Sequence, residues 1–216
     1  ETMGDGATRT TCRNDFRELI RYLSQNSSLL VAFLIAAILN LALVGLTIGA
    51  PVIVAKHLGM QSSFVGIIEV AMGLGGLVGS GLVGIWPHRF SFKGICRYVA
   101  MICLGVVPII VTLLSGPNEF AFVALAAGSA WVMAWASVTS VEVVSFVQRS
   151  APKELCGKVL ALVYMALSCA TPIGQLVYGL AYDRWTPAIV FAGMLAVLTL
   201  ITALFYRLKS RLWRMS

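Results

Sequence analysis

Long apolar stretches alternate with short polar ones along the whole chain after residue 28. Each apolar stretch exceeds 20 residues, and a helix of that length spans the roughly 30 Å hydrocarbon core of a bilayer. The pattern therefore predicts an all-α membrane protein with six transmembrane helices. The predicted spans are Leu29–Ala55, Ser63–Trp86, Gly94–Leu114, Phe120–Val147, Leu155–Tyr182 and Pro187–Leu208.

These spans predict three regions. Residues 29–208 form the six-helix transmembrane bundle, residues 1–28 a cytoplasmic tail or linker, and residues 209–216 a cytoplasmic C-terminal tail. In the first tail, apolar residues recur at helical spacing opposite Arg17 and Arg21. Two interpretations stay open for it, an interfacial amphipathic helix and a solvated linker helix. The apolar residues are Phe16, Leu19, Ile20 and Leu23.

Composition supports the membrane class. The chain is 59% hydrophobic and only 12% charged, whereas soluble domains carry about 25% charged residues. The mean hydropathy is +0.89. A soluble core cannot bury so much apolar surface, so a soluble domain is excluded.

The positions of the cations predict the orientation. Of 16 Lys and Arg residues, only Lys56 and Arg184 fall in connections on the second side of the predicted membrane. Because Lys and Arg concentrate on the cytoplasmic side, both termini are predicted to be cytoplasmic, in what we interpret as a bacterial inner membrane. The net charge of +7 does not indicate nucleic-acid binding, since the cations are not gathered with aromatic residues on one face.

The sequence shows no chemistry of a soluble enzyme. It contains no Walker A, H-E-x-x-H or G-x-S-x-G pattern. The five cysteines lack a C-x-x-C spacing, and His57 and His88 lie in loops on opposite sides, so neither a metal site nor a cofactor is predicted. No signal peptide is predicted, and the start at Glu1 is interpreted as a fragment or processed product.

An internal repeat is visible between the ends of the second and fifth spans. The stretch GSGLVGIWPHRF (79–90) aligns with GQLVYGLAYDRW (174–185), with glycine, arginine and aromatic residues at matching positions. The copies are three spans apart, so they end on opposite sides of the membrane. The sequence thus predicts a 3+3 inverted repeat, and small residues spaced by four, such as Gly75 and Gly79, predict close helix packing.

Two stretches resemble the major facilitator superfamily. GIWPHRFSFK (84–93) is similar to its loop signature G-x-x-x-D-R-x-G-R-[RK], with Gly84, Arg89 and Lys93 in place, but with His88 and Ser91 at the aspartate and second glycine positions.

The second stretch, residues 151–185, resembles the eleventh helix of that superfamily, closest to the macrolide-efflux-like drug:proton antiporters. Cys156 stands where an arginine is frequent. The resemblance implies the C-terminal six-helix half of a twelve-helix transporter that exports a small amphiphilic compound in exchange for protons. The matching residues are Pro152, Gly157, Lys158, Val159, Pro172, Ile173, Gly174, Gly179 and Asp183.

The same resemblance makes the loop residues candidates for gating contacts between transport states. The alternative is that they cap helix ends or anchor them at the headgroups. The candidates are Gly84, His88, Arg89, Lys93, Gly179, Asp183 and Arg184.

Glu69 is the first candidate for transport chemistry, because a carboxylate in hydrocarbon must be protonated, paired or facing water. We hypothesise that it faces a central cavity and exchanges a proton or binds a cationic substrate, with Gln175 at similar depth. The alternative is a carboxylate near the headgroups bonded to a neighbouring helix.

Three further residues are candidate substrate contacts. Asn40 lies near the middle of the first span with no partner evident in the sequence, and it serves either an interhelical hydrogen bond or substrate binding. Trp131 and Trp135 share a helical face and form either an aromatic wall for an amphiphilic ligand or a packed or lipid-facing pair.

Glu142 lies near the cytoplasmic end of the fourth span. We predict an interfacial ion pair with Arg149, with Lys153 as the other possible partner, in preference to a substrate role.

The resemblance implies secondary active efflux of a drug-like or siderophore-like compound by alternating access with proton coupling. The predicted partners are the lipid bilayer, protons, the substrate, and an N-terminal six-helix half or a second half-transporter. The alternative function is a six-helix accessory or scaffold subunit without transport activity.

Overall fold

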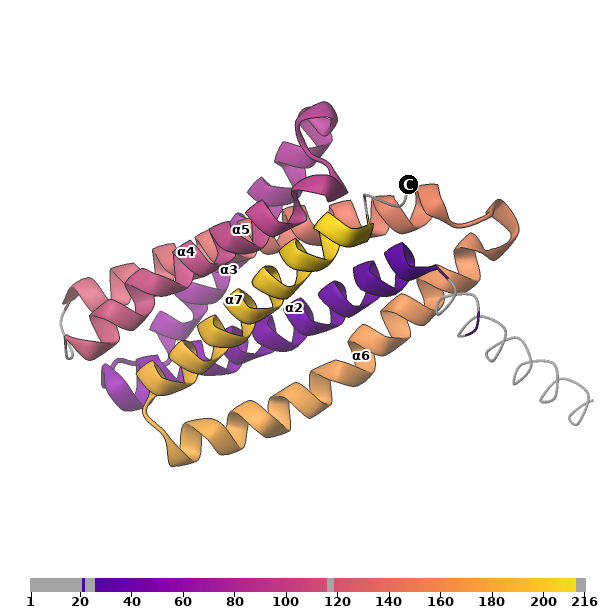
Figure 1. Cartoon of the computed structure of the whole chain (residues 1–216). Helices are drawn as coiled ribbons and strands as arrows, with labels where there is room; N and C mark the ends of the chain where they lie inside the picture. The colour runs from indigo at the N-terminus through magenta and orange to yellow at the C-terminus, as the bar shows by residue number, and fades with distance from the viewer. Residues whose placement is uncertain (1–20, 22–25, 116–118, 213–216) are drawn as a thin grey trace, which may run out of the picture.

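The computed structural model describes Arg21, residues 26–115 and residues 119–212, and within them the chain is helical apart from short turns (Figure 1). The long helices are α2 (Ser27–Val52), α3 (Ser63–Ile85), α4 (Ile95–Leu114), α5 (Glu119–Ser150), α6 (Lys153–Arg184) and α7 (Pro187–Leu212). Three short helical turns join them: the π turn η1 (Ile53–His57) and the 3-10 turns η2 (Pro87–Arg89) and η3 (Phe92–Gly94). The predicted amphipathic segment of the N-terminal tail lies almost wholly outside the described residues.

The described chain contains six helices that are long and apolar enough to cross a membrane. The predicted fold class and number of spans are therefore confirmed. The largest differences in length concern α5, α6 and α7, each of which is four residues longer than the apolar stretch that predicted it. Helix α5 continues through Gln148 and Arg149 because polar residues do not stop a helix, and it ends at Ser150, just before Pro152.

Proline does not interrupt the spans. Pro51, Pro108 and Pro172 all lie inside continuous helices. Beside Pro172, the Thr171 hydroxyl donates to the carbonyl of Leu167, 3.1 Å away. The helical path of α6 is thus unbroken from Lys153 to Arg184.

Consecutive helices run in alternating directions, so α3 and α6 finish at opposite ends of the bundle (Figure 1). The packing partners follow the same symmetry. Helix α3 packs mainly along α5, and α6 packs mainly along α2; exchanging the triplets α2–α4 and α5–α7 converts one pair into the other. The predicted 3+3 inverted repeat is present in the structure.

In the first of these equivalent interfaces, α3 approaches the backbone of α5. A Cβ atom added to Gly75 would collide with the carbonyl oxygen of Ala130, and one added to Gly79 would collide with that of Ala134. Only glycine permits so close a contact, which is the use of small residues in membrane helix packing.

In the second interface the glycines lie on α2 and large side chains lie on α6. The ring of Tyr178 fills the space beside Gly45, 2.6 Å from an added Cβ, and the ring of Tyr182 fills the space beside Gly49. The Tyr182 hydroxyl donates a hydrogen bond to the carbonyl of Gly45 at 2.9 Å. Gly174, the repeat partner of Gly79, lies against Leu41 and Val44.

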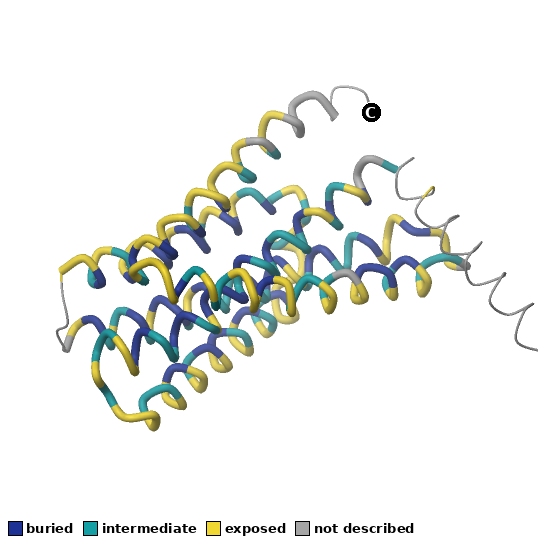
Figure 2. The backbone as a smooth tube through the Cα atoms, turned by 90° about the horizontal axis from the view of Figure 1, so that it is seen from below, coloured by how far each residue is buried: buried dark blue, intermediate teal, exposed yellow. Residues whose placement is uncertain are grey.

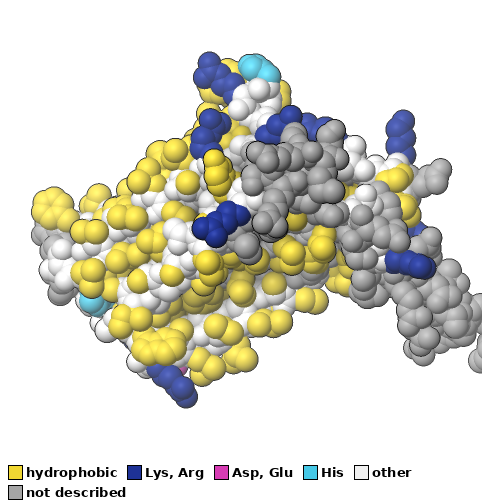
Figure 3. Space-filling view, viewed as in Figure 1, with side chains coloured by type: hydrophobic (Ala, Val, Ile, Leu, Met, Phe, Trp, Pro, Cys, Tyr) yellow, Lys and Arg dark blue, Asp and Glu magenta, His cyan; other side chains and the backbone are white. Residues whose placement is uncertain are grey.

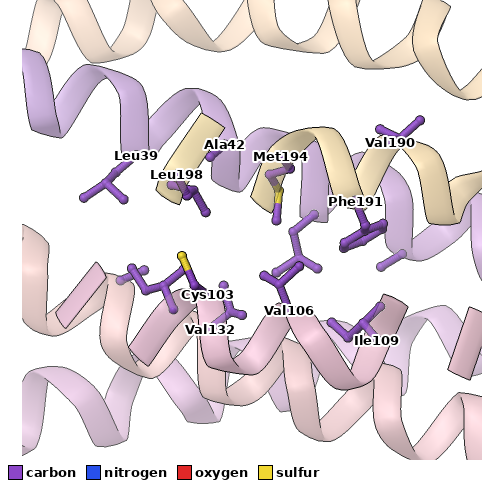
Figure 4. Close-up of a cluster of buried hydrophobic side chains, with 14 of the residues drawn as sticks. Leu39, Ala42, Cys103, Val106, Ile109, Val132, Val190, Phe191, Met194 and Leu198 are labelled. Carbon is purple, nitrogen blue, oxygen red and sulfur yellow. The ribbon is translucent and has the colours of Figure 1, made fainter. Parts of the chain in front are cut away.

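The main hydrophobic core lies between α2, α4, α5 and α7. Figure 4 shows side chains of these helices converging on one region, with Met194 and Phe191 of α7 opposite Val106 and Ile109 of α4. Phe191, Val106 and Ile109 are fully buried. This core holds the outer helices α4 and α7 to the rest of the bundle.

Helices α3 and α6 are the least covered spans. Only 22% of the α3 window and 24% of the α6 window are buried, against 44% for α2. Figure 2 shows exposed residues along the outward faces of the helices and buried ones turned inward. The two poorly covered helices occupy equivalent positions in the repeat.

The described cations are unequally divided between the two ends of the bundle. We call the end where α3 finishes and α6 begins the cation-rich end, and the other the cation-poor end. Figure 3 shows hydrophobic side chains between them, with one dark blue group at the cation-poor end, lower left. The cation-rich end carries Arg89, Lys93, Arg97, Arg149, Lys153, Lys158 and Arg207; the cation-poor end carries Lys56 and Arg184.

Candidate functional site

A cavity of about 70 Å³ lies where α2, α5 and α6 meet in the middle of the bundle. Most of its walls are apolar, and four polar side chains interrupt them. A mainly apolar wall with a few polar groups is typical of sites for small organic ligands. The lining residues are Ala36, Leu39, Asn40, Leu43, Ala136, Thr139, Ser140, Val143, Val144, Val163, Tyr164 and Leu167.

Asn40 has a partner on another helix. The Thr171 hydroxyl lies 3.3 Å from the Asn40 side-chain oxygen, and it also lies 3.1 Å from the Leu167 carbonyl of its own helix. The contact joins α2 to α6 beside Pro172, at the margin of the cavity. The interhelical contact expected for Asn40 is therefore present, and Asn40 also lines the cavity. Its role in substrate binding stays a prediction.

The other three polar side chains of the cavity differ in whether their hydroxyls are free of the helix backbone and exposed. The buried Thr139 hydroxyl donates to the carbonyl of Trp135 in its own helix, 2.8 Å away. Ser140 is exposed, and Tyr164 is 54% exposed. Ser140 and Tyr164 thus present their hydroxyls at the open side of the cavity.

The cavity is small for a complete site. Pockets for drug-sized ligands measure about 300–1,000 Å³, whereas this one holds about 70 Å³. The cavity alone is therefore too small for a drug-sized ligand. Its two exposed lining residues are Ser140 of α5 and Tyr164 of α6, one of the two poorly covered helices.

Glu69 and Gln175 lie outside this cavity. Both side chains are exposed, Glu69 on α3 and Gln175 on α6. Neighbours of Glu69 on α3 are also uncovered, including Val70 at 62% exposure. Since α3 contributes no residue to the cavity, the structure does not bring Glu69 and Asn40 into one site; it places Glu69 on the open face of the bundle.

The structure places Trp131 and Trp135 outside this cavity, packed against α4. Trp131 donates its indole N–H to the carbonyl of Met101 on α4 at 2.8 Å. Trp135 stacks on Tyr98, which is also on α4, with ring centroids 6.0 Å apart. Neither tryptophan lines the cavity, because the face of α5 that carries them packs against α4.

The loop between α3 and α4 holds one set of gating candidates. His88, Arg89 and Lys93 are exposed at the cation-rich end. The loop is fixed from beneath, since the backbone N–H of Ser91 donates to the Tyr98 hydroxyl at 2.9 Å. Gly84, just before the loop, has open space where a Cβ would be.

The second set lies at the cation-poor end, where α6 finishes. Asp183 forms an ion pair with Lys56 at 3.5 Å, and both side chains are mostly exposed. This pair joins the end of α6 to the π turn that follows α2. Gly179 has open space where a Cβ would be, and Arg184 is exposed.

Glu142 and Arg149 lie two helical turns apart on α5. Arg149 Nη2 is 3.8 Å from Glu142 Oε2, and the Glu142 residue is only 4% exposed. Glu142 Oε2 has no hydrogen-bond partner among the described residues. The carboxylate is thus more buried than an interfacial pair requires, with the Arg149 guanidinium as its counter-charge among the described residues.

Sequence reasoning missed the tyrosine contacts and three of the polar cavity residues. Tyr178 and Tyr182 share the four-residue spacing of Gly45 and Gly49, which is a detectable signal once α2 and α6 are known to be neighbours. Thr139, Ser140 and Tyr164 gave none, because single uncharged polar residues are common in membrane helices.

Comparison with known proteins agrees with this architecture. The sequence profile of a major facilitator family described as transmembrane secretion effector matches residues 5–216. Searches of curated proteins and of solved structures gave no significant match. A family match over nearly the whole chain, together with six membrane-length helices, identifies an integral membrane transport protein. The chain belongs to the transmembrane secretion effector family of the major facilitator superfamily.

Proposed function

We propose that this chain is one six-helix bundle of a secondary transporter that exports a small amphiphilic compound in exchange for protons. The observation that carries the proposal is the cavity between α2, α5 and α6, with Asn40 in an otherwise mainly apolar wall. An amphiphile needs this combination, because its apolar part requires an apolar surface and its polar group requires a hydrogen-bond partner.

A second six-helix bundle completes the site in this proposal. The uncovered faces of α3 and α6 support this, since they leave large apolar side chains such as Leu77 and Leu176 more than 60% exposed. Major facilitator transporters expose a site at the membrane midplane to each side in turn by rocking one bundle against the other. The second bundle is either an N-terminal half or another half-transporter.

We place the cation-rich end in the cytoplasm, within a bacterial inner membrane. The excess of Lys and Arg at that end supports this orientation. In this frame the loop with His88 and Arg89 faces the cytoplasm, and the Lys56–Asp183 pair faces the other side. We propose these two regions as the contacts that change between the two states.

Glu69 is our candidate for proton exchange or for recognition of a cationic substrate. Its position on the open face of α3 supports a role where the two bundles meet, because exposure to hydrocarbon would be costly for a carboxylate. Gln175 occupies the open face of α6 and is the corresponding candidate for a hydrogen bond to substrate.

The experiment is transport by the intact protein in inside-out vesicles, measured across a panel of drugs and siderophores with and without a pH gradient. For a transported compound, Asn40→Ala should raise KM by about threefold to tenfold, the equivalent of one lost hydrogen bond. Thr112→Val is the control, because the Thr112 hydroxyl bonds only to its own helix, away from the cavity.

Each outcome distinguishes the alternatives. Glu69→Gln should abolish accumulation driven by the pH gradient while leaving substrate exchange without a gradient. Unchanged gradient-driven transport by Glu69→Gln would exclude Glu69 as the coupling group. Absence of any exchange by the wild-type protein across the panel would favour an accessory or scaffold role.

A further inference from the structure

A second hollow lies on the outside of the bundle, between α4 and α7. It measures about 370 Å³ and is lined by Ala100 and Cys103 of α4 and by Thr199, Thr202, Ala203 and Tyr206 of α7. It is remote from the cavity described above, with which it shares no residue. Its location makes it open to lipid rather than to the interior.

The groove exists because small residues face each other across two tightly joined helices. Val106 of α4 and Leu198 of α7 belong to the same buried core, which joins the two helices. At the surface, Ala100 and Ala203 are exposed and leave space between the helices. A hollow between packed helices therefore opens outward.

The lining is apolar in spite of two threonines. The Thr199 hydroxyl donates to the carbonyl of Leu195 at 2.9 Å, and the Thr202 hydroxyl donates to that of Leu198 at 2.7 Å. Because each hydroxyl already donates its proton to a carbonyl of its own helix, it does not need a hydrogen-bond acceptor on a ligand. The groove suits a hydrocarbon chain better than a polar ligand.

Positive charge flanks the groove at one end. Arg97 lies one turn before Ala100 on α4, and Arg207 follows Tyr206 on α7; both are exposed. The helices run in opposite directions, so the start of α4 and the end of α7 lie at the same, cation-rich end of the bundle (Figure 1).

We propose that the groove between α4 and α7 binds an anionic phospholipid, with one acyl chain along Ala100, Cys103 and Ala203 and the phosphate between Arg97 and Arg207. Basic sites between transmembrane helices on the cytoplasmic side bind anionic headgroups in this manner. Tyr206, 69% exposed, lies at the level where tyrosine side chains contact the headgroup region.

Lipid binding in this groove depends on neither the substrate nor proton coupling. It requires only that the bundle lies in a membrane, so it would stand even if no transport were observed.

The test uses the intact protein in nanodiscs of mixed phosphatidylethanolamine and phosphatidylglycerol. Each lipid is supplied in turn as a photoreactive analogue with a diazirine in the acyl chain, and labelled peptides are identified by mass spectrometry. We expect the phosphatidylglycerol probe to label the peptides around Ala100 and Ala203 well above the phosphatidylethanolamine probe. A cation near the membrane surface contributes about 1 kcal/mol to such binding, so Arg97→Gln or Arg207→Gln should each lower this labelling about fivefold.

Two further variants test the geometry. Ala203→Phe fills the groove and keeps both arginines, and it should also lower phosphatidylglycerol labelling. The double variant Arg89→Gln/Lys153→Gln removes two exposed cations from the same end at other helices, and it should leave the labelling unchanged.

The opposite results would overturn the proposal. Equal labelling by both probes would show no preference for an anionic headgroup. If the double variant lost as much phosphatidylglycerol labelling as the single arginine variants, the effect would come from general surface charge. If Ala203→Phe left the labelling unchanged, the acyl chain would not lie in the groove. A protein–protein crosslink through α4 and α7 would place a second copy there instead.

Discussion

The hydroxyl of Tyr182 on α6 donates a hydrogen bond to the backbone carbonyl of Gly45 on α2, at 2.9 Å and across the full width of one helix interface. The oxygen that accepts it already belongs to the helical backbone of α2. The bond is accessible only because Gly45 and Gly49 carry no side chains. It fixes the register between two helices that are far apart in sequence.

Removing this hydrogen bond should weaken the α2–α6 contact modestly. We expect Tyr182→Phe to lower the free energy of unfolding by about 0.6–1 kcal/mol, the usual value of an interhelical hydrogen bond in a membrane. Tyr178→Phe is the matched control, since Tyr178 contributes its ring to the contact with Gly45. Thermal unfolding in detergent compares them; an equal loss in both variants would contradict a specific role for the Tyr182 hydroxyl.

The glycines of α3 should fall into two classes. Gly79→Ala places a Cβ against the carbonyl of Ala134, so the helices must separate and stability should fall by about 1–3 kcal/mol. Gly81→Ala meets no atom within 4 Å and should be neutral or stabilising by up to about 1 kcal/mol, because alanine favours a helix. Similar losses in both would mean that the close α3–α5 contact is absent in the membrane.

Glu142 and Arg149 should respond unequally to neutralisation. Arg149→Gln leaves a carboxylate that is 4% exposed without its counter-charge, at an expected cost of about 1–3 kcal/mol. Glu142→Gln removes the buried charge itself and should cost less, because a desolvated ion is expensive to hold. A double-mutant cycle on thermal stability measures the pair, and a greater loss in Glu142→Gln would assign that carboxylate another partner.

The Lys56–Asp183 pair should contribute little to stability. Both side chains are mostly exposed, and exposed ion pairs contribute about 0–1 kcal/mol, less in high salt. We therefore expect Lys56→Gln to leave the unfolding midpoint nearly unchanged. If the pair closes one transport state, the same variant should instead alter the transport rate, which the vesicle assay measures directly.

The spans and their inverted arrangement could be predicted because they depend on quantities that the sequence carries. The length of an apolar run determines whether it crosses a membrane. The copies that contain Gly79 and Gly174 are three spans apart, an odd number, so they point in opposite directions. Helix ends were less predictable. The predicted apolar run of the fourth span ends at Val147, but its helix continues to Ser150.

The site was less predictable because helical spacing identifies a shared face without identifying its neighbour. Trp131 and Trp135 do lie on one face, yet that face meets α4 and not the cavity. Asn40 was identifiable as a polar residue near the middle of a span. Its contact with Thr171, 131 residues away along the chain, required the packing of α6 on α2.

The two equivalent interfaces of the repeat, α3–α5 and α2–α6, differ in the group that faces the glycine and in whether that group can move. At Gly79 an added group meets the main chain of α5, which cannot turn aside, whereas at Gly45 it meets a tyrosine ring, which can rotate away. The α3–α5 interface is therefore rigid, and the α2–α6 interface is deformable. A distortion that acts on both interfaces equally would therefore change the α2–α6 interface first, by rotation of a tyrosine ring.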